Sequence, residues 1–258
     1  MHHFSSDGVD IAFIDNQPLE HVAPGNGATV MLVHGFASNH AVNWVNTLWT
    51  TTLGRAGFRV VALDHRGHGE SQKLYDSRLY GPAIMAEDVR RLMDHLGIER
   101  ADVIGYSMGA RITAQLAYAH GWRVRSAVLG GLGPRLVEGT MFADGIAEAM
   151  EAPSLDSLTD PMQRMFRAFA EQLKCDLKAL SACVRGSHLP MTREQCASIK
   201  APILVAAGTK DPLAREPERL AAMFPNARVL EIPGRDHNLA VGDRVHKQGV
   251  VSFLSERP

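Results

Sequence analysis

The chain has 258 residues, 45% of them hydrophobic, and a formal net charge of −1 with histidine counted as neutral. A chain of this length and composition buries one substantial core, and α/β proteins of this size often form a single domain. The nearly balanced charge gives no electrostatic basis for binding nucleic acid or an anionic membrane surface.

The sequence shows no sign of export, membrane insertion or metal binding. No apolar run approaches the roughly 20 residues of a membrane-spanning helix, and the first residues, MHHFSSDGVDIAF, lack the basic segment and apolar core of a secretory signal. Cys175, Cys183 and Cys196 are odd in number and lack the spacing of a metal site, so we expect reduced, mostly buried thiols. We therefore expect a soluble cytoplasmic protein that binds no metal.

The first half of the chain alternates expected strands and helices. Asp7-Gly8 is a turn pair between two β-prone runs. Apolar residues recur at intervals of three and four between Tyr80 and Leu96, with Gly97 as a C-cap. This alternation predicts a mostly parallel sheet with helices on both faces. The expected elements are a hairpin over 4–14, strands over 28–35, 58–64, 101–106 and 124–131, and helices over 42–53, 80–96 and 107–119.

The alternation breaks between about residues 133 and 190, where strand signals stop and helical signals remain. Asp160 and Pro161 form an N-cap and N1 pair that predicts a helix start. An apolar stripe follows on that helix. It consists of Met162, Met165, Phe166, Phe169 and Leu173.

The β/α pattern then resumes, which predicts one α/β core with an insertion. We expect the core to comprise residues 1–133 and 189–258, and a short helical cap to comprise residues 134–188. The elements expected after the cap are strands over 201–208 and 227–232, a helix over 217–223 and a last helix that reaches Leu254.

The segment Gly105–Gly109, GYSMG, fits the G-x-S-x-G pattern of a nucleophile elbow. The serine of such an elbow occupies a sharp turn between a strand and a helix, which pass so close that side chains two residues on either side would clash. Glycine at both positions removes the clash. The alternative is that Ser107 is only a turn residue, but its place between an apolar strand and an alanine-rich helix favours a nucleophile.

A serine hydroxyl reacts at neutral pH when a neighbouring base takes its proton. Among 12 histidines, His237 follows the last expected strand, in a loop at the carboxyl edge of the sheet where the serine also emerges. Asp211 directly follows another apolar strand and is the expected orienting acid, although an Asp before Pro212 is by itself typical of a turn. Asp236 ranks below it, because neighbours in a loop rarely align for this bond. The resulting order Ser, Asp, His is that of the elbow fold.

A serine nucleophile also needs backbone donors for the oxyanion that forms during attack. The amide of Met108 is one candidate, at a helix N-terminus whose dipole favours negative charge. The amide of Phe36, in the loop after the strand at 28–35, is the other.

Five segments resemble the α/β-hydrolase family and occur in the family's order over nearly the whole chain outside 134–188. The resemblance implies an eight-stranded sheet with the second strand antiparallel and a helical cap after the sixth strand. It implies the same roles for Ser107, His237, Asp211 and the Phe36 and Met108 amides, and a structural role for the loop DHRGHGES. The segments are VHGF (33–36), LDHRGHGES (63–71), GYSMG (105–109), GTKDP (208–212) and GRDH (234–237).

This sequence departs from the patterns of several subgroups of the family, and these differences narrow the range of expected activities. Epoxide hydrolases and haloalkane dehalogenases of this fold place Asp at the elbow, where this chain has Ser107. Epoxide hydrolases also use cap tyrosines, and all four tyrosines here precede the cap. Hydrolases of carbon–carbon bonds usually carry Trp soon after the catalytic histidine, and Asn238-Leu239 at that place weakens this assignment without removing it.

We therefore expect a serine hydrolase that needs no cofactor and cleaves a carboxylic ester or lactone with an apolar moiety. Side chains expected to touch the substrate are Phe36, Met141, Phe142, Met162 and Phe166. For most of the stripe, packing of the cap onto the core is the favoured interpretation. A cofactor-free perhydrolase or acyltransferase, a carbon–carbon bond hydrolase and a low-turnover ligand receptor stay open, as does the choice between monomer and homodimer.

Overall fold

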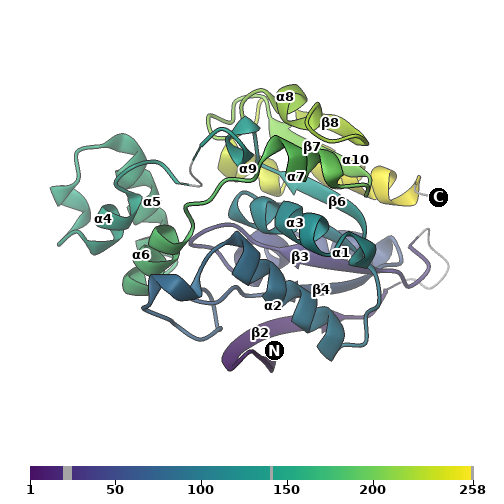
Figure 1. The fold of residues 1–258 in the computed structure, drawn as a ribbon, viewed down its shortest axis with the longest axis horizontal. Helices are drawn as coiled ribbons and strands as arrows, with labels where there is room; N and C mark the ends of the chain where they lie inside the picture. Colours follow the sequence, from purple (N-terminus) through teal and green to yellow (C-terminus); the bar gives the residue numbers. More distant parts are fainter. Residues whose placement is uncertain (20–24, 140–141, 257–258) are drawn as a thin grey trace.

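The computed structural model describes residues 1–19, 25–139 and 142–256. Its centre is an eight-stranded sheet in the order β1-β2-β4-β3-β5-β6-β7-β8 (Figure 1). β2 runs antiparallel to both neighbours, and the six strands from β4 to β8 in that order run parallel. The predicted mostly parallel sheet is confirmed. The strands are β1 (His2–Ser6), β2 (Val9–Asn16), β3 (Thr29–Val33), β4 (Arg59–Leu63), β5 (Ala101–Tyr106), β6 (Val124–Gly130), β7 (Ile203–Gly208) and β8 (Ala227–Ile232).

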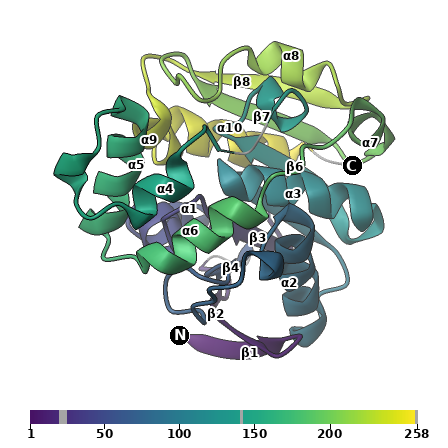
Figure 2. The ribbon, with the colours of Figure 1, turned by 60° about the vertical axis from the view of Figure 1, so that its left-hand side comes forward.

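The central strands contribute side chains to two hydrophobic cores, one on each face of the sheet. In β3, Val30 and Leu32 join the core under α1 and α10, whereas Met31 and Val33 join the core under α2 and α3 (Figure 2). Side chains alternate along a strand, so an unbroken apolar run is buried on both faces. The helices of the core are α1 (Trp49–Arg55), α2 (Pro82–His95), α3 (Met108–Ala119), α7 (Arg193–Ser198), α8 (Pro217–Ala221), α9 (His237–Val241) and α10 (Arg244–Ser255).

The helical stretch predicted over 42–53 is helical at both ends, but the structure divides it into two pieces. A π-helical turn covers Ala41–Val45, and α1 begins at Trp49. The first piece ends at its C-cap Asn46, and Leu48, with φ 65° in the left-handed region, is the N-cap of α1. The Trp49 indole N–H donates to the carbonyl oxygen of Val241 at 2.7 Å, which anchors the start of α1 to α9.

Three helices between β6 and β7 gather at one end of the molecule (Figure 1). The side chain of Asp160 accepts a hydrogen bond from the Gln163 amide and caps α5, as predicted. The buried Arg167 of α5 donates to the carbonyl oxygens of Ala149 at 2.7 Å and Ala152 at 2.9 Å, which ties α5 to the end of α4. The helices are α4 (Ile146–Glu151), α5 (Pro161–Gln172) and α6 (Leu177–Gly186). The exact cap boundaries stay a prediction. Within the described ranges, no helix combines the length and the apolar character that crossing a bilayer requires.

Among the described residues, four histidines are fully buried in the core. Burial lowers the pKa of His34 and of His246 to about 4 and that of His68 to about 3, and it also lowers the pKa of His65 well below its ordinary value. The rings of His34 and His65 lie 4.4 Å apart between centroids, and the His34 Nε2 atom accepts the amide N–H of His65 at 3.0 Å. These imidazoles are neutral in the folded protein at neutral pH.

Acid should therefore destabilise the protein well before its carboxylates titrate. Below the ordinary histidine pKa of about 6.5 the unfolded chain takes up protons that the folded chain does not, so the free energy of unfolding falls with pH by about 1 kcal/mol per pH unit for each such histidine. The loss runs from pH 6.5 down to the lowered pKa values. Urea unfolding between pH 7 and pH 5 measures it.

A His246→Asn variant should show a shallower dependence on pH, because one buried imidazole is gone. Replacement of the exposed His188 by Gln is the matched control and should leave the slope unchanged. A free energy of unfolding that stays constant between pH 7 and pH 5 would contradict this account.

Candidate active site

Ser107 lies at the turn from β5 into α3, with φ 55° and ψ −114°. This is an unfavourable backbone conformation for a residue with a side chain. A Cβ atom on Gly105 would lie 2.2 Å from the carbonyl oxygen of Gly109, and one on Gly109 would lie 1.9 Å from that of Val33. Both glycines are therefore required by the close approach of α3 to β5 and to β3.

Asp211 and His237 are in direct contact. The carboxylate Oδ2 of Asp211 lies 2.7 Å from Nδ1 of His237. The other carboxylate oxygen accepts the amide N–H groups of Leu213 at 2.8 Å and Ala214 at 3.2 Å. Because the carboxylate accepts, the imidazole proton belongs on Nδ1, and Nε2 is left to accept a proton.

The loop predicted after the last strand is present over 233–236, but it is shorter than expected, because His237 begins the short helix α9. Asp236 is the N-cap of that helix, and its Oδ1 atom accepts the amides of Asn238 at 3.1 Å and Leu239 at 2.9 Å. An Asp at an N-cap satisfies amides that otherwise lack acceptors. The carboxylate of Asp236 therefore bonds backbone amides of α9, whereas that of Asp211 bonds the imidazole of His237.

Tyr106, directly before Ser107, fixes the backbone of His237. Its hydroxyl donates to the His237 carbonyl oxygen at 2.6 Å, and the two rings lie 5.3 Å apart between centroids. Burial, followed by the negative charges of Asp211 and Asp236, raises the Tyr106 pKa well above its ordinary value, so the phenol stays a donor.

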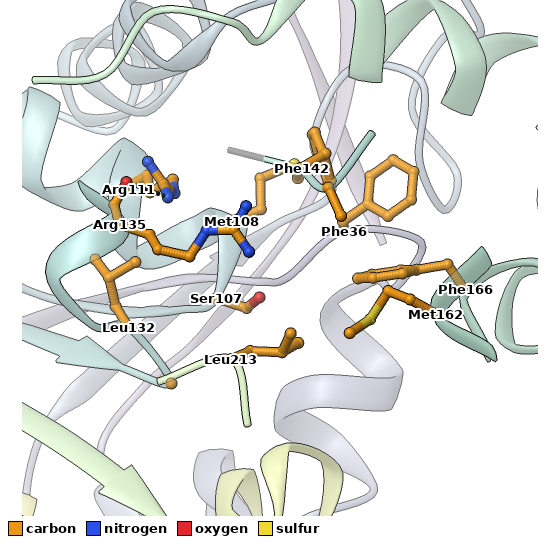
Figure 3. Close-up of a pocket in the computed structure, with 12 residues that line it drawn as sticks. Phe36, Ser107, Met108, Arg111, Leu132, Arg135, Phe142, Met162, Phe166 and Leu213 are labelled. Carbon is orange, nitrogen blue, oxygen red and sulfur yellow. Dashed lines mark hydrogen bonds between the residues drawn. The ribbon is translucent and has the colours of Figure 1, made fainter. Parts of the chain in front are cut away.

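Two cavities meet at Ser107. The larger one, of about 300 Å³, is bounded by both Ser107 and His237. The smaller one, of about 50 Å³, extends along the first turn of α3 past Met108 (Figure 3). Phe36, Ser107, Phe166 and Leu213 line both cavities. The structure therefore brings the serine and the histidine of the prediction to one cavity.

The backbone amides of Phe36 and Met108 have no acceptor among the described residues. The loop that carries Phe36 lies against the serine, since a Cβ atom on Gly35 would be 3.5 Å from the Ser107 Cβ atom. The amide of Gly35 donates to the side chain of the buried Asn43 at 2.8 Å, and the His34 imidazole bonds the Gly35 carbonyl oxygen at 2.7 Å. These two contacts set the orientation of the loop.

The cap supplies one wall of the site. Phe142, Met162 and Phe166 line the smaller cavity, while Met165, Phe166 and Phe169 line the larger one. The ring of Phe36 packs on Phe142 at 4.6 Å between centroids. The stripe thus both packs and faces the cavities, although packing alone was the favoured interpretation for most of it. Met141 lies outside the described residues.

Sequence reasoning missed four residues of the site, namely Asn43, Tyr106, Arg111 and Arg135. Arg111 had a usable signal, because a charged residue one turn after Ser107 interrupts an otherwise apolar helix face. Asn43 had none, since its contact with Gly35 depends on how the π-helical turn folds back on the loop. In the three described ranges, no group of three or more His, Cys, Asp or Glu side chains is placed to hold a metal ion.

Comparison of the sequence with known proteins adds a family match and several relatives. A model described as the alpha/beta hydrolase fold matches residues 28–156. An acetyltransferase component of the acetoin cleaving system from Cupriavidus necator is 41% identical over 121 residues, which are 46% of this chain and 30% of that protein. The match thus takes in under a third of that relative's length. A non-heme chloroperoxidase, CPO-A1 from Kitasatospora aureofaciens, is 25% identical over 97% of this chain and 98% of its own.

Solved structures of similar fold cover almost the whole chain. A hydrolase from Pseudomonas aeruginosa PA01 superposes with a TM-score of 0.74 at 26% identity, over 98% of this chain and 97% of that one. The enol-lactonase from Burkholderia xenovorans LB400 has a TM-score of 0.76 at 22% identity, over 99% of this chain and 100% of that one. At the latter identity the likeness is one of fold.

Asn43 should be needed for turnover more than for folding. In Asn43→Ala the Gly35 amide loses its acceptor and the Phe36 amide is no longer held in place, so we expect kcat for an activated ester to fall about 10- to 100-fold with little change in KM. Steady-state kinetics and a thermal melt measure the two effects. The exposed Asn46, in the same segment, gives the control Asn46→Ala. Equal kinetics for the two variants would remove Asn43 from the site.

Proposed function

The chain belongs to the alpha/beta hydrolase fold family, and from that premise we propose that it is a serine hydrolase that cleaves a carboxylic ester or lactone through an acyl-enzyme on Ser107. The observation that carries the proposal is the 2.7 Å contact between Asp211 and the Nδ1 atom of His237, on a cavity that Ser107 also lines. It leaves Nε2 of the imidazole as the base for the serine hydroxyl.

The proposed reaction begins when the Ser107 oxygen attacks the substrate carbonyl and passes its proton to Nε2 of His237. The carboxylate of Asp211 stabilises the imidazolium that results. The tetrahedral intermediate collapses, the bond to the leaving alcohol breaks, and the imidazolium returns its proton to that alcohol. Water then attacks the acyl-enzyme with the same proton transfers, which releases the carboxylic acid and restores the serine.

Two backbone amides are the proposed donors for the negative oxygen of the intermediate. The Met108 amide is the first of α3, a 12-residue helix whose dipole favours negative charge at this end. The Phe36 amide projects from the loop held by Asn43 and His34. Because neither amide has an acceptor among the described residues, both are free to bind the oxyanion without breaking another bond.

The two cavities suggest how a substrate is oriented. Since His237 protonates the leaving alcohol and lines the larger cavity, we place the alcohol part there and the acyl part in the smaller cavity beside Met108. A volume of about 300 Å³ is at the lower end for small-molecule sites, where typical values are roughly 300–1,000 Å³. Its apolar wall suits an apolar alcohol and is formed by Val42, Met165, Phe166, Phe169 and Val241.

Perhydrolysis is a second candidate, favoured by the similarity to the non-heme chloroperoxidase over 97% of the chain. In that reaction hydrogen peroxide replaces water in the attack on the acyl-enzyme, and a peracid leaves instead of an acid. Halide oxidation that requires both peroxide and a carboxylic acid, and that disappears in Ser107→Ala, would support it. Ester hydrolysis without such oxidation would leave the hydrolase alone.

The assignment of the serine is tested by labelling with a fluorophosphonate, which forms a covalent bond with an activated serine. We expect one label on the wild-type protein, at Ser107, and none on Ser107→Ala. A label that persists on the variant at undiminished level would overturn the proposed nucleophile.

The assignment of the acid has a matched control in the neighbouring carboxylate. Asp211→Asn leaves the imidazole without a carboxylate and favours the wrong tautomer, so kcat should fall by about 10⁴-fold. Asp236→Asn keeps a capping residue for α9 and should stay within a few-fold of wild type. Equal losses in the two variants, measured with an activated ester, would contradict the role of Asp211.

A further inference from the structure

The smaller cavity is positively charged on one side. Arg111 and Arg135 line it together with Ser107, and no Asp or Glu is among the described residues around it. Neither guanidinium forms a salt bridge with a carboxylate in the part of the chain that the structure describes. This contrasts with Arg66, a buried arginine that pairs with Asp88 at 2.7 Å.

Arg111 is held in place without being neutralised. It is on α3, four residues after Ser107, and only 6% exposed. One of its nitrogens, Nη2, donates to the carbonyl oxygen of Arg135 at 2.7 Å, and no described residue accepts from the other two. Burial, followed by the charge of Arg135, lowers the pKa of Arg111 to about 10, so the group is still charged at neutral pH.

Arg135, whose carbonyl oxygen accepts the hydrogen bond from Arg111, adds a second positive charge to the cavity. It is exposed as a residue, but its side chain turns inward and extends toward Ser107 (Figure 3). The cap residues Met162 and Phe166 stand across the cavity from it. Two like charges beside a partly desolvated cavity are costly unless an anion joins them. The cavity therefore has the chemistry of a carboxylate site next to the nucleophile.

We propose that the substrate of this hydrolase carries a carboxylate on its acyl part, and that Arg111 and Arg135 bind it. This rests on the proposed function, which places the acyl part in the smaller cavity. With a volume of about 50 Å³ the cavity holds the carboxylate end of a short acyl group, such as that of a dicarboxylic acid esterified at one end, and the rest of that group lies at the mouth beside Ser107, where the two cavities meet. Paired guanidinium groups suit such a carboxylate, because each offers planar, forked donors.

A structural role for Arg111 alone would predict something different. Its single bond to the Arg135 carbonyl oxygen would tie α3 to the start of the cap, and substrate charge would then have no effect on turnover. The two interpretations differ in one measurable quantity, namely the preference for an anionic over a neutral acyl group of the same shape.

The experiment compares benzyl hydrogen succinate with benzyl levulinate, in which a methyl ketone replaces the carboxylate. We expect kcat/KM of the wild-type protein to be at least 10-fold higher for the succinate. In Arg111→Gln and in Arg135→Gln this ratio should fall toward one, whereas Arg111→Lys should keep part of it. The exposed Arg228, paired with Glu256, provides the control Arg228→Gln, which should keep the full ratio.

A binding measurement guards against a variant that folds poorly. Succinate should raise the melting temperature of Ser107→Ala, and it should do so less when Arg135→Gln, an exposed position, is added. Equal turnover of the two esters, abolished by Ser107→Ala, would overturn the carboxylate site and leave the serine hydrolase intact. Hydrolysis that survives in Ser107→Ala would overturn the proposed function itself.

Discussion

The close approach of α3 to two strands is the constraint on which the rest of the site depends. The helix begins so near to β5 and β3 that glycine is the residue that fits at 105 and 109. The chain between them has to turn sharply, and Ser107 takes a φ of 55° that packing on both sides maintains. As a result Ser107 lines both cavities and Met108 lines the smaller one.

Side chains from distant segments hold the groups around the turn at Ser107, namely Gly35 and His237. Asn43 accepts from the amide of Gly35 and His34 bonds its carbonyl oxygen, and these contacts hold Gly35, just beyond β3, against the serine. Asp211 holds the imidazole of His237 from β7. His34 and Asp211 lie just beyond the carboxyl ends of the parallel strands β3 and β7, so the sheet sets their common position, whereas Asn43 reaches Gly35 from the π-helical turn Ala41–Val45.

The strands, the elbow and the cap helix at Asp160 could be predicted because each has a local signal: an apolar run, a glycine pair or a capping pair. The number of strands and the antiparallel second strand followed from the resemblance to a known family, whereas the order of the strands came from the structure. The break at Leu48 escaped prediction, because a leucine rarely takes a left-handed conformation and nothing local marked one here. Likewise, α9 escaped because its cap, Asp236, resembled a rival acid. The catalytic use of Asp211 with His237 stays a prediction, although the structure brings them into contact.

Arg111 and the cap stripe show where single-sequence reasoning ends. A period of three and four residues identifies which face of a helix is apolar, but whether that face meets core or cavity is decided by other segments. Phe142 and Phe166 pack on the ring of Phe36, which comes from a strand end about a hundred residues earlier. Contacts between residues so far apart in sequence exist only in the folded chain, so the sequence pattern of one helix does not reveal them.

Tyr106 connects the two parts of the site that carry Ser107 and His237. It is the last residue of β5, directly before Ser107, and its phenol donates a hydrogen bond to the carbonyl oxygen of His237 on α9. The end of β5 is therefore joined both to the turn at Ser107, through the peptide bond, and to the main chain of His237, through this hydrogen bond. Two residues 130 positions apart in sequence thus share one anchor, the Tyr106 phenol for the backbone of His237, while Asp211 holds its imidazole.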